Sequence, residues 1–229
     1  SVQSLASGST VGATTTGEVS LSAGNITAQS NVNLNGNLIK STALGNFASN
    51  QLLLTGSNAQ SSATLSGSTI NGDNSAADLT VANFQNANAS AVSAITRQGD
   101  SPTSRYQLQM TVSGIDTGTA SVNNNAIAAL GYVNNAVNTL GMGVTNSGNL
   151  NAAVVNLQKA EDAANASASA LGQVSLLASA AVDTASLAVN GNVISGAAYS
   201  NSSTNTLVVT GTEVVGRGVT DRLVRADTN

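Results

Sequence analysis

The sequence offers few side chains that could carry out catalysis. It contains no histidine and no cysteine, which removes the commonest general acid–base residue, the thiolate nucleophile and the usual zinc ligands. Lys40 precedes Ser41, but neighbouring positions in a sequence do not place a base against a nucleophile. Asp73 and Asp78 lack the spacing of a calcium loop. We therefore predict that the chain is not an enzyme and binds neither a cofactor nor a metal ion.

The composition limits the kind of fold that can hold a core. Aromatic residues are 2% and charged residues 8% of the 229 residues, against a usual charged share of about 25%. A core must therefore be made of Val, Leu, Ile and Ala, which suit thin layers packed at short range. The chain has only seven Lys and Arg residues, too few to predict the basic surface with which proteins bind nucleic acids. No stretch approaches the roughly 20 apolar residues of a membrane helix, so we predict no membrane span.

Alternating polar and apolar residues, with period two, are the main secondary-structure signal. This alternation is typical of strands that bury one face. The clearest runs are 18–23, 31–34, 64–66, 78–84 and 106–112. Asn-Gly dipeptides, which favour tight turns, separate several of these runs. The pattern predicts an all-β protein of short strands and tight turns.

An internal repeat is the most specific feature of the sequence. Leu34-Asn35-Gly36-Asn37-Leu38-Ile39 matches Val189-Asn190-Gly191-Asn192-Val193-Ile194, and further identities follow without a gap up to Gly56 and Gly211. A looser middle copy is indicated where Ala43-Leu44-Gly45 recurs as Ala129-Leu130-Gly131. Repeats of this kind imply stacked structural units. We take Asn35, Gly36, Asn37, Asn190, Gly191 and Asn192 as the turns of the repeat.

The run Asn35–Ile39 and the run Ala43-Leu44-Gly45-Asn46-Phe47-Ala48-Ser49-Asn50 resemble the repeats of secreted bacterial β-solenoid adhesins. They are also similar to curli-like and holdfast-anchor proteins, which form surface fibres. The resemblance implies export, surface display and self-association. Taken with the alternation, it leaves two architectures open: a repeat-containing β-solenoid or an elongated β-sandwich.

The chain divides by composition into three parts. Residues 1–17, rich in Ser, Thr and Gly, predict either a flexible arm or a strand donated to a neighbour. Residues 18–212 form the β-rich body. Within the body, the Ala-rich stretch 157–170 predicts one short helix. Residues 213–229 form a charged tail.

Together these features predict an extracellular structural subunit that assembles with copies of itself into a surface filament. Strand edges with little charge or proline invite such association. The terminal segments are the expected joints, and charged residues of the tail are the proposed contacts: Glu213, Arg217, Asp221, Arg222 and Arg225. One alternative is a monomeric adhesin that binds cell-surface polysaccharide through Tyr106, Tyr132, Tyr199, Phe47 and Phe84. The other, which the charged residues favour least, is a β-helix enzyme acting on polysaccharide.

Overall fold

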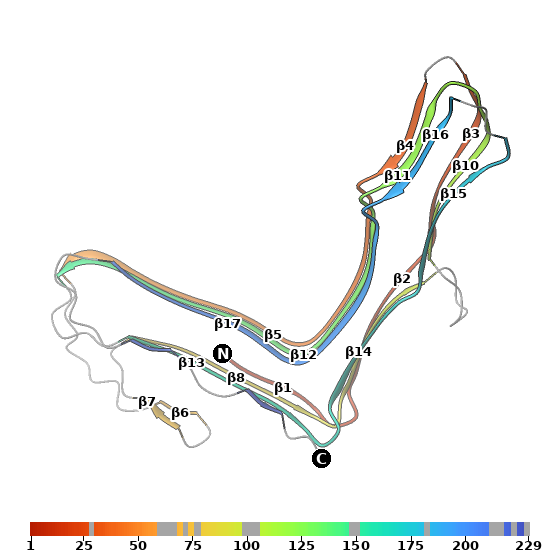
Figure 1. Ribbon diagram of the computed structural model, residues 1–229. Helices are drawn as coiled ribbons and strands as arrows, with labels where there is room; N and C mark the ends of the chain where they lie inside the picture. The colour runs from red at the N-terminus through yellow and green to blue at the C-terminus, as the bar shows by residue number, and fades with distance from the viewer. Residues whose placement is uncertain are drawn as a thin grey trace.

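The protein is a parallel β-solenoid in which the chain winds through three stacked coils and begins a fourth (Figure 1). The computed structural model describes residues 1–27, 30–58, 68–70, 73–75, 79–97, 106–146, 152–180, 184–210, 218–220 and 224–226. Strands make up the regular structure of these ranges, which contain no helix long and apolar enough to cross a membrane.

Each of the three coils contains five strands in the same order. The first coil contains β1 (Val2–Leu5), β2 (Thr10–Thr16), β3 (Glu18–Ile26), β4 (Asn31–Asn35) and β5 (Leu38–Asn58). The second contains β8 (Leu79–Asn88), β9 (Ala91–Arg97), β10 (Tyr106–Ile115), β11 (Thr119–Asn123) and β12 (Ala126–Asn146). The third contains β13 (Ala152–Glu161), β14 (Asn165–Ala170), β15 (Gly172–Ala178), β16 (Ser186–Asn190) and β17 (Val193–Thr210).

Every strand of a coil pairs in parallel with the equivalent strand of the next coil. The sheets run β1-β8-β13-β18, β2-β9-β14, β3-β10-β15, β4-β11-β16 and β5-β12-β17. Between the first two coils, β6 (Ser68–Ile70) and β7 (Asp73–Ser75) form a separate antiparallel hairpin. The all-β prediction is thus confirmed, and of the two architectures the structure has the solenoid.

Each coil is flattened and bent into an L, so that the stack has two arms and an elbow (Figure 1). The long strands β5, β12 and β17 line the inner side of the bend. At the elbow the alternation of β12 changes phase, because the consecutive residues Val133 and Asn134 are both fully buried. Gly45 lies at the same level of β5, and a Cβ there would lie 2.6 Å from the carbonyl oxygen of Val133. The close approach of the two coils at the bend therefore requires glycine.

The interior changes in character along the L. One arm is filled by larger apolar side chains, among them Ile26, Met110 and Ile115. The elbow is lined by small residues, mainly alanine, which let the facing strands come close. The other arm buries amide side chains, which form ladders described below. The buried amides of this arm are Asn46, Asn83, Gln85, Asn134, Asn138, Asn156 and Gln158.

The predicted short helix over residues 157–170 is wrong. These residues instead form the end of β13, a turn at Asp162 and Ala163 with positive φ, and β14. Ala160 is buried in the elbow, and the alternate alanines of β14 pack against the same cluster. Alanine favours a helix only weakly, and the pairing of both strands with the second coil outweighs that preference. The Ala-rich composition reflects the narrow elbow.

The two terminal segments both contribute strands to the stack. Residues 1–17, expected to form a flexible or donated arm, contain β1 and β2, which pair with β8 and β9. In the C-terminal segment, β18 (Gly218–Thr220) and β19 (Val224–Ala226) pair with β13 and so begin a fourth coil.

Candidate functional site

The repeated Asn-Gly-Asn motif lies where each coil turns into its long strand. Asn35-Gly36-Asn37 connects β4 to β5, and Asn190-Gly191-Asn192 connects β16 to β17. The second coil has Asn123-Asn124-Asn125 at the same level. The central residue is left-handed in all three turns, with φ of 70° at Gly36, 54° at Asn124 and 64° at Gly191. Glycine and asparagine are the residues that adopt this conformation most readily.

Asparagine side chains join the three turns along the stack. Asn125 Oδ1 accepts hydrogen bonds from the backbone and side-chain nitrogens of Asn37, both at 2.9 Å. Asn125 Nδ2 donates to Asn192 Oδ1 at 2.8 Å and to the carbonyl oxygen of Leu34 at 2.9 Å. A carbonyl oxygen can only accept a hydrogen bond, so the bond to Leu34 identifies the amide nitrogen of Asn125. The ladder therefore has a direction along the stack.

We expect Asn125→Ala to destabilise the fold by about 2–3 kcal/mol, because it removes the acceptor of both Asn37 nitrogens and one of the two donors to Asn192 Oδ1 at a buried site. Urea denaturation followed by circular dichroism measures the change. Asn124→Gly is the matched control, since glycine adopts the same left-handed backbone and no side-chain bond of Asn124 is lost. An equal loss in both variants would show that the turn backbone, and not the ladder, determines stability.

The middle copy of the repeat lies two residues away from where the sequence placed it. The matched runs 34–39 and 189–194 are in the same register on the first and third coils. In the second coil, however, Ala43 is paired with Gly131 and Ser41 with Ala129. The short match of Ala43-Leu44-Gly45 to residues 129–131 was therefore out of register. The three consecutive asparagines at 123–125 were the signal that would have given the correct one.

Three more amide ladders run through the interior beyond the elbow. One joins Asn46, Asn134 and Asn201 at 2.8 and 2.7 Å, and a second joins Asn50, Asn138 and Asn205 at 2.8 Å each. In both, the nitrogen of each coil donates to the oxygen of the next. The third, of Gln3, Gln85 and Gln158, runs in the opposite direction. Such ladders form when identical side chains stack in register, as in cross-β assemblies.

The apolar positions of the core also form columns along the stack, and the columns are open at the third coil. Ile39, Ile127 and Ile194 occupy one column, with exposed fractions of 7%, 0% and 44%. Among the described residues of β16 and β17, nothing continues the stack in the way that β11 and β12 continue β4 and β5. The third coil therefore presents core residues at its face.

The residues considered for catalysis do not come together. Lys40 is exposed, whereas the Ser41 hydroxyl points inward and donates to the carbonyl oxygen of Ala13 at 2.7 Å. Asp73 begins β7, and Asp78 lies outside the described residues. Over the described ranges, no three acidic side chains gather as a metal site would require.

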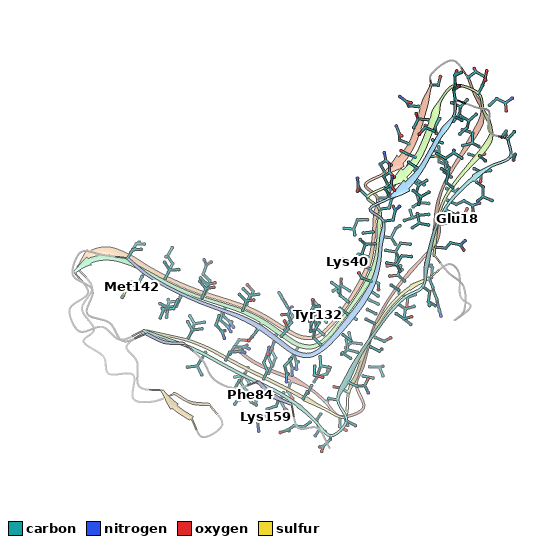
Figure 2. The ribbon with its side chains drawn as sticks, in the orientation of Figure 1. Glu18, Lys40, Phe84, Tyr132, Met142 and Lys159 are labelled. Carbon is teal, nitrogen blue, oxygen red and sulfur yellow. The ribbon has the colours of Figure 1, made fainter. Side chains whose placement is uncertain are left out.

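The aromatic residues considered for polysaccharide binding separate into two groups. Tyr132 lies at the bend (Figure 2). It stacks on Tyr199, with ring centroids 5.0 Å apart and an angle of 13° between the ring planes. Phe47, 45% exposed, lies three residues beyond this level on β5. Phe84 belongs to β8, on the outer side of the L. The side chain of Tyr106 is outside the described part.

The proposed contact residues of the tail fall largely outside the structure. Glu213, Arg217, Asp221 and Arg222 lie outside the described residues. Arg225 is in β19, in register with Lys159 of β13.

A scan against protein-family models and searches of the curated proteins and of the solved structures found no match.

Proposed function

We propose that this chain is an extracellular structural subunit that stacks head to tail with copies of itself to form a filament. The observation that carries the proposal is the open face of the third coil, where a column of core isoleucines ends with Ile194 at 44% exposure. A second copy that placed its first coil on this face would cover the column. Apolar burial is the main driving force for association of this kind.

The internal repeat supports this arrangement, because the two faces that would meet have similar sequences in the same register. Asn37 would lie on Asn192, Ile39 on Ile194 and Asn50 on Asn205. The direction of the ladders also fits: Nδ2 of each coil donates to Oδ1 of the next, so Asn205 would donate to Asn50 of the added copy. A heterologous contact that repeats without closing produces a filament.

The scarcity of charge supports stacking of identical units. Only 8% of the residues are charged, and Lys40 is in register with Ala128 and Ser195 in the other coils. Like charges in register would repel one another in every layer. The extracellular location belongs to the proposal as well, and rests on the likeness of the Asn-Gly repeats to those of secreted fibre proteins.

The test is to image the purified protein by negative-stain electron microscopy and to record fibre diffraction from aligned material. We expect unbranched filaments with a reflection at about 4.8 Å along the axis, because the strands lie across it. The subunit repeat should be about 14 Å, or three strand spacings. Particles that remain monomeric at high concentration would contradict the proposal.

The stacked pair Tyr132 and Tyr199 favours one alternative function, a monomeric adhesin that binds polysaccharide at the inner side of the bend. Stacked rings present an apolar surface with hydroxyl groups at its edge. A chain that stays monomeric and binds immobilised polysaccharide, with binding lost in Tyr199→Ala, would support this alternative over the filament.

A further inference from the structure

A ladder of glutamine side chains joins the first strands of the three coils. Gln158 Nε2 donates to Gln85 Oε1 at 2.7 Å, and Gln85 Nε2 donates to Gln3 Oε1 at 2.8 Å. Each glutamine also donates across the core to a carbonyl oxygen of the facing long strand: Phe47 for Gln3, Asn135 for Gln85 and Ser202 for Gln158. The two bonds that each of the Gln85 and Gln158 nitrogens donates fix the direction of the ladder toward the first coil.

The ladder ends on a group without a partner. Gln158 is fully buried, and its Oε1 receives no hydrogen bond from the described residues. The next strand on β13 is β19, which places Val224 in register with Gln158. Valine has no side-chain donor. Leaving a buried acceptor without a donor is unfavourable, and a strand with valine in register at this position supplies none.

A second mismatch occurs at the next residue of β19. Arg225 is in register with Lys159, so two positively charged residues are neighbours in one sheet. Like charges at directly opposite positions destabilise strand pairing. Lys159 Nζ lies 3.4 Å from Glu161 Oε1, but an ion pair as exposed as this one contributes little to stability. Both mismatches indicate that β19 is a weak partner for β13.

The strand that matches β13 at these positions is β1. Within one chain, Gln3 pairs with Gln85 and Ser4 with Asn86, and these residues of β8 pair in turn with Gln158 and Lys159. We propose that in the filament β1 of the next copy takes the place of β19 on β13. Gln3 Nε2 of that copy then donates to Gln158 Oε1 and continues the ladder, and Ser4 replaces Arg225 beside Lys159.

This joint fits the rest of the stack. With β1 of the next copy directly on β13, its β2 to β5 lie directly on β14 to β17. The strand β18 pairs with Ala152–Val154, which are the positions of Leu79–Val81 in β8, whereas β1 pairs with Phe84–Ala87. Thus β18 can remain in place, and only β19 must leave. The inference rests on the proposed self-assembly and adds that β19 is a removable cap.

The register can be tested by cross-linking, because the natural chain has no cysteine. In Ser4→Cys/Lys159→Cys the two Cα atoms across a joint would be about 4.8 Å apart, which a disulfide can span. We expect oxidised filaments to give a ladder of covalent multimers on a non-reducing gel. Ser4→Cys/Asn86→Cys is the matched control, since those residues pair within one chain and should give only cross-linked monomer. Mixing the two single variants Ser4→Cys and Lys159→Cys should give covalent dimers.

The cap is tested by changing β19 in opposite directions. Val224→Gln/Arg225→Ser gives β19 the Gln-Ser pair of β1 and is expected to lengthen the lag of assembly several-fold. A chain ending at Thr220 is expected to shorten the lag several-fold.

Filaments that form normally without intermolecular cross-links, while the control pair cross-links, would overturn this joint and leave the proposed function standing. Equal lags for the two β19 variants would overturn the cap. Absence of wild-type filaments would overturn both proposals.

Discussion

Replacing Ile194 with arginine is expected to abolish filament growth while leaving the single chain folded. In one chain Ile194 is 44% exposed, so a long side chain there can carry its charge into water. In the filament the same position would be covered by Ile39 of the next copy. A guanidinium group enclosed there would have neither water nor a counter-ion, and a buried charge without a partner is strongly unfavourable.

Sedimentation of the assembled fraction and negative-stain imaging measure growth, and circular dichroism checks that the single chain is folded. Val137→Arg is the control. Val137 is 38% exposed, but it belongs to the second coil and points out of the stack, away from both faces. We expect this variant to assemble like the wild type. Normal filaments of Ile194→Arg would show that the third coil is not a contact face.

An all-β fold with stacked repeats, a solenoid or an elongated sandwich, could be predicted because two kinds of local signal agreed. The alternation in residues 18–23 and 106–112 corresponds to β3 and β10, which lie on each other in register. The matched runs 34–39 and 189–194 occupy the same level of two coils. Strands and stacking are both visible in one sequence, since alternation reports a half-buried strand and repetition reports equivalent environments.

The amide ladders could not be predicted from the same signals. The alternation of polar and apolar residues assigns Asn134 and Gln85 to the solvent-exposed face of their strands because they are polar, yet both are fully buried. The offset of the internal repeat relates the first- and third-coil members of each ladder, but the second coil divides that offset in two ways: Gln85 bonds residues 82 and 73 positions away, whereas Asn134 bonds residues 88 and 67 positions away. Insertions between strands make the coils unequal in length, so the repeat does not reveal the middle member of each ladder or the burial of its amide.

The bend of the coils could not be predicted from the sequence either. Its residues are small, and Ala160 and Ala168 read as a helix because alanine has the highest intrinsic helix preference. Their role becomes visible only when β14 lies against the elbow cluster. Both terminal segments were predicted as joints. Our proposal gives that role to β1 of the N-terminal segment, which would pair with β13 of another copy, together with the open face of the third coil, and does not use the charged residues of the tail.

The largest loss of stability is expected for Asn134→Asp, which replaces the amide NH₂ group of one buried side chain with a carboxylate oxygen. Asn134 Nδ2 donates to Asn201 Oδ1 and to the carbonyl oxygen of Lys159, both at 2.7 Å. A carboxylate cannot donate either bond, and its charge would face two oxygen atoms at a fully buried site. An uncompensated buried charge destabilises a fold by about 3–5 kcal/mol. We expect a loss of this size at pH 7.

The loss should depend on pH in a defined direction. Burial raises the pKa of the introduced carboxyl above its value of about 3.9 in the unfolded chain. Between these two pKa values the folded state binds more protons than the unfolded state, so stability falls as pH rises through that window. Acidification to about pH 4 should therefore recover much of the loss relative to wild type, measured by urea denaturation at several pH values. Asn134→Leu lacks the same hydrogen bonds but has no titrating group, so its cost should not change with pH. A pH-independent loss in Asn134→Asp would mean that the introduced carboxylate reaches water, and that the ladder is not the closed interior seen here.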